Sequence, residues 1–177
     1  GKYILEKLAR IPVEVVLASE FRYCDPIIDS RTLVVVISQS GETLDTMAAL
    51  REAKSLGARI LSIVNVVGSS IARESDDVLY TWAGPEIAVA TTKAYSTQMA
   101  VLDLLAIYLA GQRKTITAED MRRLTSAIAA LPAQVEQILS NREQIQYYAS
   151  QYFNHDSVFF IGRNLDYALG MEGSLKL

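Results

Sequence analysis

The sequence has very little of the residue types from which disulfide scaffolds and metal centres are built. It contains one cysteine, Cys24, and one histidine, His155, in 177 residues. A single cysteine cannot form an internal disulfide, so a disulfide-stapled fold is excluded. One histidine and one cysteine also leave little from which a zinc site could be assembled, and we expect no bound metal.

An excess of positive charge is absent as well. Lys and Arg total 17 against 20 for Asp and Glu, which gives a formal net charge of −3. Gripping a nucleic-acid backbone requires a basic surplus, so we expect no nucleic-acid partner. The longest apolar stretch, residues 94–110, is interrupted by Asp103 and a Ser-Thr-Gln run, and it does not predict a membrane span. Because no signal-like apolar segment opens the chain, we expect a cytoplasmic protein.

Strand and helix signals alternate along a chain of ordinary globular composition, with 50% apolar and 21% charged residues. The β-branched and apolar runs that predict strands lie at 12–17, 32–37, 59–64, 77–81 and 157–161. Helical spacing predicts helices at 2–9, 43–56, just after 68–70, 92–110, 117–131, through 135–139, 140–152 and 166–177. This alternation predicts an α/β fold, in which a parallel sheet is flanked by helices on both faces in three layers.

Both ends of the chain lie inside helical patterns that lack start and stop residues. We therefore expect part of a longer polypeptide. A new strand and helix begin near residue 157, after a run of helices. This change predicts a first domain over residues 1–150 and the start of a second domain over residues 151–177.

The segment from Ser38 to Thr43 (SQSGET) carries the most informative pattern. It follows a predicted buried strand and precedes a helix, so it lies at the carboxyl end of the sheet, where ligands bind in parallel sheets. The helix start offers free N–H groups, and Ser38, Ser40 and Thr43 add hydroxyl donors beside the Gln39 amide. No lysine follows the glycine, which excludes a nucleotide-triphosphate loop and favours a phosphate monoester. A simple helix cap by Ser40 or Thr43 is the alternative, and both interpretations stay open.

Two further places could carry chemistry. Lys93 lies in the first turn of a predicted helix, where the dipole disfavours a cation, so it is either an ion-pair or ligand-binding residue or a solvated lysine. Thr91 or Thr92 would cap that helix. Glu172 and Lys176 are four residues apart on one helix face, so they could serve as proton donor and acceptor or form an ordinary surface pair.

Five segments of the chain resemble the glucosamine-6-phosphate synthase family, whose isomerase portion is built from sugar-isomerase (SIS) domains. These segments are ASEFRY (18–23), ISQSGETLDT (37–46), NVVGSSIARESD (65–76), EIAVATTKAYSTQ (86–98) and ALGMEGSLKL (168–177). They occur in the family's order and spread over most of the chain. The resemblance implies a SIS fold of the flavodoxin-like type, with the family's first strand missing and the start of a second SIS unit at the other end.

The resemblance also assigns roles to three groups of residues. The residues that match the loop holding the phosphate of fructose 6-phosphate are Ser38, Gln39, Ser40 and Thr43. The residues that match positions lining the sugar are Val89, Ala90 and Thr91. The residues that match an acid and an amine of the isomerase active site are Glu172 and Lys176.

The reaction implied by the resemblance is aminotransfer coupled to isomerisation. Ammonia released from glutamine adds to opened fructose 6-phosphate, and a proton moves between C2 and C1 to give glucosamine 6-phosphate, without a cofactor. The implied partners are a glutaminase domain in the full-length enzyme and a second copy in a homodimer. The family's principal proton-transfer glutamate, ring-opening histidine and glutaminase cysteine have no match here, so we expect the chain alone to be inactive. The alternatives are another SIS isomerase or deglycase, a sugar-phosphate-sensing regulatory module, and a fragment that serves only dimer packing.

Overall fold

The structure is a computed structural model that describes residues 1–177, and it contains a parallel sheet of three strands. The strands are β1 (Leu33–Ser38), β2 (Arg59–Val64) and β3 (Asp77–Tyr80), side by side in that order. Val36 of β1 pairs with Ser62 of β2, which in turn pairs with Val78 of β3. Since all three strands run in the same direction, the loops that follow them meet at one edge of the sheet.

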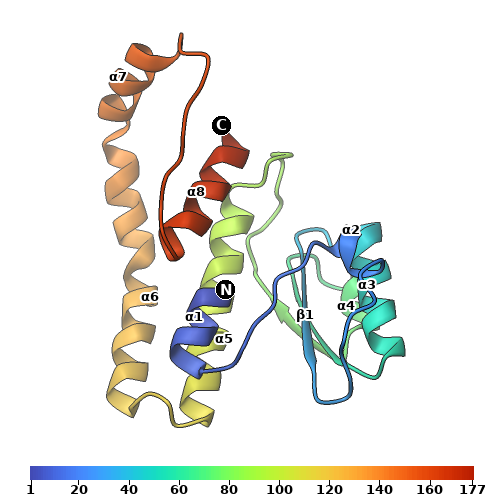
Figure 1. Cartoon of the computed structure of the whole chain (residues 1–177). Coiled ribbons are helices and arrows are strands. Elements are labelled where there is room, and N and C mark those ends of the chain that lie inside the picture. The colour runs from blue at the N-terminus through green and yellow to red at the C-terminus, as the bar shows by residue number, and fades with distance from the viewer.

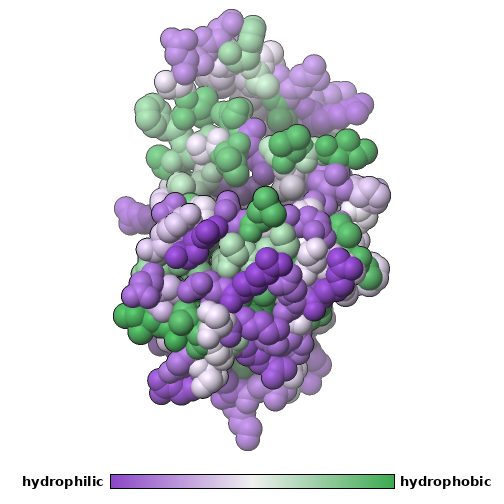
Figure 2. Space-filling model, turned by 90° about the vertical axis from the view of Figure 1, so that its right-hand side faces the viewer, coloured by the Kyte–Doolittle hydropathy of each residue, from purple (hydrophilic) through white to green (hydrophobic).

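One face of the sheet carries the main hydrophobic core. Val36, Ile60 and Val64 pack there against Leu50 and Ile71, because the alternation along each strand places these apolar side chains on the same side. The helices on this side are α2 (Ala18–Phe21), α3 (Leu44–Ser55) and α4 (Ser70–Glu74) (Figure 1). The face that these helices turn to solvent is largely hydrophilic (Figure 2). The core therefore holds the carboxyl ends of β1 and β2 in place beneath the loops that follow them.

A second group of helices lies on the other side of the sheet (Figure 1). It is formed by α5 (Lys93–Gln112) and by α1 (Lys2–Ile4), which continues as the π-helical turn η1 (Leu5–Ala9) and packs on α5. Ala106 and Ala110 of α5 are fully buried, so small side chains allow this close packing. The predicted α/β fold, with a parallel sheet flanked by helices, is confirmed.

The C-terminal third of the chain is helical. Its helices are α6 (Ala118–Ser140), α7 (Arg142–Tyr152) and α8 (Leu165–Lys176). The predicted start of α6 is confirmed, because the Thr117 hydroxyl accepts a hydrogen bond from the Asp120 N–H at 3.0 Å. None of the helices in the chain is long and apolar enough to cross a membrane.

The predicted end of a helix at Leu131 is wrong, since α6 runs through Pro132 to Ser140. Proline removes one N–H and crowds one carbonyl, but the apolar stripe of this helix continues in register on both sides of it. The predicted helix through 135–139 is therefore the second half of α6. The next helix begins with Asn141 as its N-cap rather than with Ser140, whose hydroxyl donates instead to the Gln137 carbonyl at 2.7 Å.

Two predicted strands, 12–17 and 157–161, are also wrong. Both segments are extended and largely exposed, and neither pairs with another strand. A β-branched run favours extended backbone, but a strand also needs a neighbour to share its hydrogen bonds. The sheet therefore ends at β1 on one side and at β3 on the other.

Candidate functional site

The loops that follow the three strands converge on one hollow at the carboxyl edge of the sheet. Its volume is about 520 Å³, and its lining residues are Gln39, Asn65, Val66, Trp82, Gly84, Pro85 and Glu86. Gln39 follows β1, Asn65 follows β2, and Trp82 follows β3 by two residues. The hollow thus lies where parallel α/β folds bind their ligands, and of the four predicted phosphate-binding residues only Gln39 lines it.

The loop after β1 is closed by its own hydroxyl groups. The Ser38 and Thr43 hydroxyls share a hydrogen bond of 2.9 Å, and the Ser38 Oγ also accepts from the Gly41 N–H at 3.0 Å. The Ser40 Oγ accepts from the Glu42 N–H at 3.2 Å. Thr43 is the N-cap of α3, yet its side chain makes no capping bond, so the alternative of a simple helix cap does not describe this loop. The first N–H groups of α3 remain without a side-chain acceptor.

Gly41 is the tightest point of this loop. Its φ is +68°, and a Cβ added there would lie 2.0 Å from Ser69 Oγ and 2.5 Å from Ser69 Cβ. Its carbonyl accepts from the Ile71 N–H at 3.0 Å. The buried Ser69 hydroxyl, which presses on Gly41, has no hydrogen-bond partner. Glycine is therefore required on both conformational and steric grounds.

Glu42 fastens the same loop to α4. Its carboxylate accepts a hydrogen bond from the Ser70 N–H at 2.7 Å. This bond with Ser70 lowers the pKa of Glu42 below its ordinary value, and the nearby charge of Arg73 lowers it further. The loop after β1 is thus anchored through Gly41 and Glu42 to the start of α4.

Asn65 joins the other two loops. Its backbone N–H donates to the Gln39 carbonyl at 3.2 Å, and its side-chain amide donates to the Gly84 carbonyl at 2.7 Å. Its Oδ1 accepts from the Thr81 hydroxyl at 3.0 Å and from the Ala83 N–H at 2.8 Å. One residue therefore links the loop after β1 to the loop after β3 at the hollow.

Glu86 organises the approach to α5. Its carboxylate accepts hydrogen bonds from the N–H groups of Thr92 and Ala94, each at 3.2 Å. Partial burial raises the pKa of Glu86, but the N–H donors of Ala94 and Thr92 outweigh this effect, and the pKa lies below its ordinary value. Thr92 is the N-cap of α5 without a side-chain capping bond, so the predicted cap by Thr91 or Thr92 is wrong. A carboxylate from six residues earlier satisfies these N–H groups instead.

The predicted sugar-lining residues lie in the segment between Glu86 and the N–H groups of Thr92 and Ala94 that its carboxylate binds. Val89 is 102% exposed and Ala90 is exposed as well, while Thr91 is half-buried. These three residues do not line the hollow. Lys93, at the start of α5, is exposed and forms no ion pair, although its charge contributes to the lowered pKa of Glu86. The interpretation of Lys93 as a solvated residue therefore agrees with the structure.

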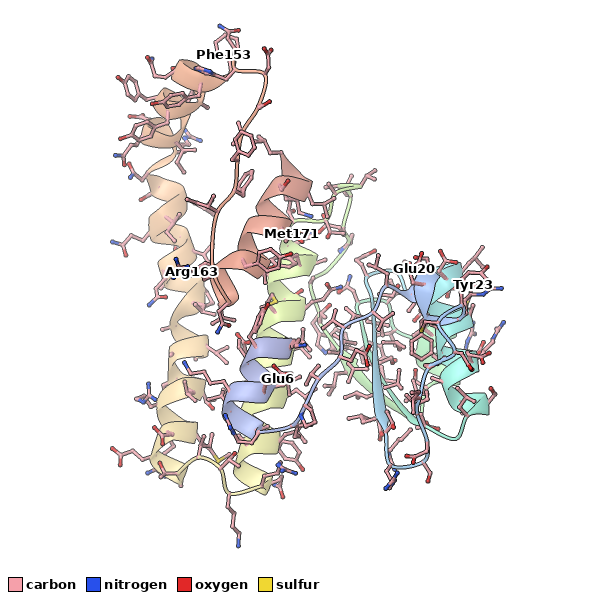
Figure 3. The ribbon with its side chains drawn as sticks, in the orientation of Figure 1. Glu6, Glu20, Tyr23, Phe153, Arg163 and Met171 are labelled. Carbon is pink, nitrogen blue, oxygen red and sulfur yellow. The ribbon has the colours of Figure 1, made fainter.

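Glu172 and Lys176 form an ion pair on α8, with 2.7 Å between Oε1 and Nζ. Their side chains are 23% and 29% exposed, so the pair is more sheltered than an ordinary surface pair. Burial raises the pKa of Tyr95 on α5, and the charge of Glu172 raises it further while that of Lys176 lowers it. The pair therefore lies near the start of α5; Figure 3 shows the neighbouring Met171 on this part of α8. It does not line the hollow.

Three residues of the site escaped prediction: Asn65, Trp82 and Glu86. Asn65 directly follows a strand, which is the one sequence signal that could have singled it out.

Cys24 is exposed, and its thiol donates a hydrogen bond to the Phe21 carbonyl at 3.1 Å. No group of three or more metal-ligating side chains comes together anywhere in the chain.

Comparisons with known proteins agree with this geometry. The sequence model of the SIS domain matches residues 1–108. The glutamine–fructose-6-phosphate aminotransferase (isomerizing) of Clostridium acetobutylicum is 55% identical over 100% of this chain, and that of Symbiobacterium thermophilum is 58% identical over the same span. The chain spans 29% of the length of each of these relatives.

Solved structures show the same fold. The C-terminal domain of glucosamine-fructose-6-phosphate aminotransferase from Francisella tularensis has a TM-score of 0.95 at 37% identity, over 99% of this chain and 50% of that one. A putative phosphosugar isomerase from Clostridium difficile has a TM-score of 0.65 at 27% identity, over 73% of this chain and 38% of that one. The resemblance predicted from the five sequence segments is thereby confirmed.

Proposed function

The chain belongs to the SIS domain family, and on that premise we propose that it binds fructose 6-phosphate as part of the isomerase portion of a glutamine:fructose-6-phosphate aminotransferase. The observation that carries this proposal is the loop from Ser38 to Thr43, placed at the carboxyl edge of the sheet beside the hollow. The identity of this whole chain to enzymes of that name supports the substrate.

In this proposal the phosphate is bound by hydroxyl and backbone N–H donors of the loop from Ser38 to Thr43 and of the start of α3. The Ser38, Ser40 and Thr43 hydroxyls can rotate from their present partners toward phosphate oxygens. The N-terminus of α3 adds N–H groups that no side chain caps, and the helix dipole favours a dianion at that position. The phosphate then anchors the substrate so that its remote binding energy positions the reacting carbons.

The proton transfers require an acid and a base near C1 and C2. Ammonia attacks the C2 carbonyl, water leaves to give an imine, and one proton leaves C1 while another is delivered to C2. We assign Glu172, which is paired with Lys176 at 2.7 Å, as the carboxylate that accepts a proton and Lys176 as the ammonium that returns one. The step is a tautomerisation in which C1 is oxidised to the aldehyde level while the C2 imine is reduced to an amine, so it consumes no external oxidant or reductant.

We propose further that the chain acts in the cytoplasm, beside a glutaminase domain, and as a homodimer. Sugar-phosphate substrates and the names of its relatives support the first two statements. Exposed apolar side chains on α6 and α7 support a subunit contact. The side chains concerned are Val135, Ile138, Leu139, Ile145, Tyr148 and Tyr152.

Thermal unfolding tests the substrate assignment. A ligand that binds only the folded chain raises its Tm, by an amount that grows with the logarithm of the ligand concentration once this exceeds the Kd. Fructose 6-phosphate is expected to raise the Tm, and fructose is not. Equal shifts with both sugars, or no shift with either, would contradict the proposal. A panel of sugar phosphates, assayed on the longer protein with and without an ammonia source, separates an aminotransferase from another SIS isomerase.

A further inference from the structure

Trp82 adopts a backbone conformation that a large side chain rarely takes. Its φ is +53°, in the left-handed region that is unfavourable for residues with a bulky Cβ substituent. Its side chain is also 76% exposed, although tryptophan gains much from burial. Strained residues of this kind persist where their surroundings determine them, and they cluster at binding sites.

The surroundings that determine this conformation belong to the site. Asn65 Oδ1 accepts hydrogen bonds from Thr81 and Ala83, the two residues that flank Trp82, and the Asn65 amide donates to Gly84. The backbone therefore wraps around one side chain and turns sharply at Trp82. The same Asn65 is bonded to Gln39 of the loop after β1. Trp82 and that loop are thus held by one residue at the rim of one hollow.

The indole has little to pack against within the chain. Tyr80 is its one aromatic neighbour, with ring centroids 5.7 Å apart and planes tilted by 55°. The other lining residues combine three polar side chains, Gln39, Asn65 and Glu86, with Val66, Gly84 and Pro85. An exposed aromatic ring in a hollow of about 520 Å³ that also offers amide and carboxylate groups is suited to a ligand with one apolar face and several hydroxyls. A monosaccharide meets this description, because its C–H groups gather on one face while its hydroxyls point outward.

We propose that the Trp82 indole forms a wall of the sugar subsite and stacks on the carbon skeleton of the sugar phosphate. This inference rests on the proposed function, since it requires a phosphate held by the loop from Ser38 to Thr43. The loop recognises the phosphate, and Trp82 distinguishes a sugar ester from inorganic phosphate. Trp82 is therefore a specificity-determining residue, positioned by Asn65.

Fluorescence and calorimetry test this role. Trp82 is the single tryptophan, so emission excited at the red edge of absorption reports on it alone. Fructose 6-phosphate is expected to change the intensity and wavelength of this emission in a saturable manner, and inorganic phosphate to change it much less. A saturable calorimetric signal for fructose 6-phosphate without any change in emission would overturn the inference.

Three variants separate the ring from the fold. Trp82→Asn removes the ring but tolerates a positive φ, so the variant is expected to unfold at the same Tm or higher and to bind fructose 6-phosphate about tenfold more weakly. Its affinity for inorganic phosphate is expected to be unchanged. Trp82→Phe keeps a ring and should retain most of the affinity. Tyr23→Asn is the matched control, because Tyr23 is also 76% exposed but lies beside α2 (Figure 3) and does not line the hollow.

The outcomes distinguish the two proposals. If the parent chain binds fructose 6-phosphate and Trp82→Asn binds it within about twofold of the parent, the inference is overturned and the proposed function stands. If the folded parent chain binds neither the sugar ester nor inorganic phosphate, the proposed function is overturned and the inference with it. Weakening by Tyr23→Asn as large as that by Trp82→Asn also overturns the inference.

Discussion

The hydroxyls of Ser38 and Thr43 lie 2.9 Å apart and tie together the two ends of the loop that follows β1. The Ser38 oxygen holds the Gly41 N–H as well, so the free loop is a closed ring of hydrogen bonds. The ring holds these hydroxyls close together, and in the proposed complex phosphate oxygens take the place of the bond between Ser38 and Thr43.

Ser38→Ala is expected to destabilise the fold. Ser38 is buried, and its loss leaves the Gly41 N–H without its acceptor, which costs about 1–3 kcal/mol in the free energy of unfolding. Ser40→Ala is the control, because Ser40 is half-exposed and water can replace its bond to Glu42. Urea denaturation of both variants measures the difference. Equal stabilities of the two variants would mean that the ring contributes nothing.

Gly41→Ala is expected to cost more stability than Gly68→Ala. Both glycines have a positive φ, +68° and +73°, so both alanines are strained in the backbone. Only the new Cβ at position 41 meets another group, the Ser69 side chain, whereas nothing lies within 4 Å at position 68. The difference between the two free energies of unfolding isolates the steric part, of about 1–3 kcal/mol. Adding Ser69→Gly to Gly41→Ala should restore the steric part of the lost free energy of unfolding and no more. If it restores none, the new Cβ does not meet the Ser69 side chain.

Glu86→Gln is expected to reduce the loss of folding stability that the chain shows as the pH falls. Because the pKa of Glu86 is lower in the folded chain than its ordinary value of 4.5, its stabilising effect is present above about that pH and is lost as the pH falls through the folded value. The stability gap between the parent and Glu86→Gln should therefore shrink as the pH falls from neutral toward 3. Denaturation at a series of pH values measures this gap. Glu136→Gln, an exposed change on α6, is the control, and an equal pH dependence in both variants would contradict the role of Glu86 at α5.

Tyr95 is expected to report on the charges of α8. Because Glu172 raises and Lys176 lowers the pKa of Tyr95, Lys176→Met should raise this pKa further and Glu172→Gln should lower it. NMR of chains labelled with ¹³C at the tyrosine Cζ follows each titration. Tyr108, farther along α5, is the internal control. Shifts of the same sign in the two variants would place the ion pair away from Tyr95.

The elements that could be predicted from the sequence are those that local physics determines. The runs at 32–37 and 59–64 are apolar enough to be central strands, and the Thr117–Asp120 spacing is a complete local cap. The loop after β1 could be found because its three hydroxyl residues lie within one run of six residues, 38–43. Its closed geometry, with Ser38 bonded to Thr43, could not be read from spacing alone.

The features that could not be predicted depend on partners distant in the chain. Asn65 acts by reaching residues 16 to 19 positions later, and Glu86 reaches forward to the start of α5. The segments 12–17 and 157–161 have strand composition but no strand beside them. The helix α6 continues through Pro132 because the apolar stripe on both sides of it favours one helix. The rule that proline ends a helix considers only the proline itself and does not include this stripe.

Calorimetric titration of the folded chain with fructose 6-phosphate, and separately with fructose, decides whether the loop from Ser38 to Thr43 binds a phosphate. We expect saturable binding of the phosphate ester and none of the free sugar. Ser40→Asp should abolish binding by placing a carboxylate against the phosphate, while Ser55→Asp, at the exposed end of α3, should leave it intact. Circular dichroism verifies that each variant is folded. Equal binding of fructose and its phosphate, or undiminished binding by Ser40→Asp, would contradict the phosphate loop.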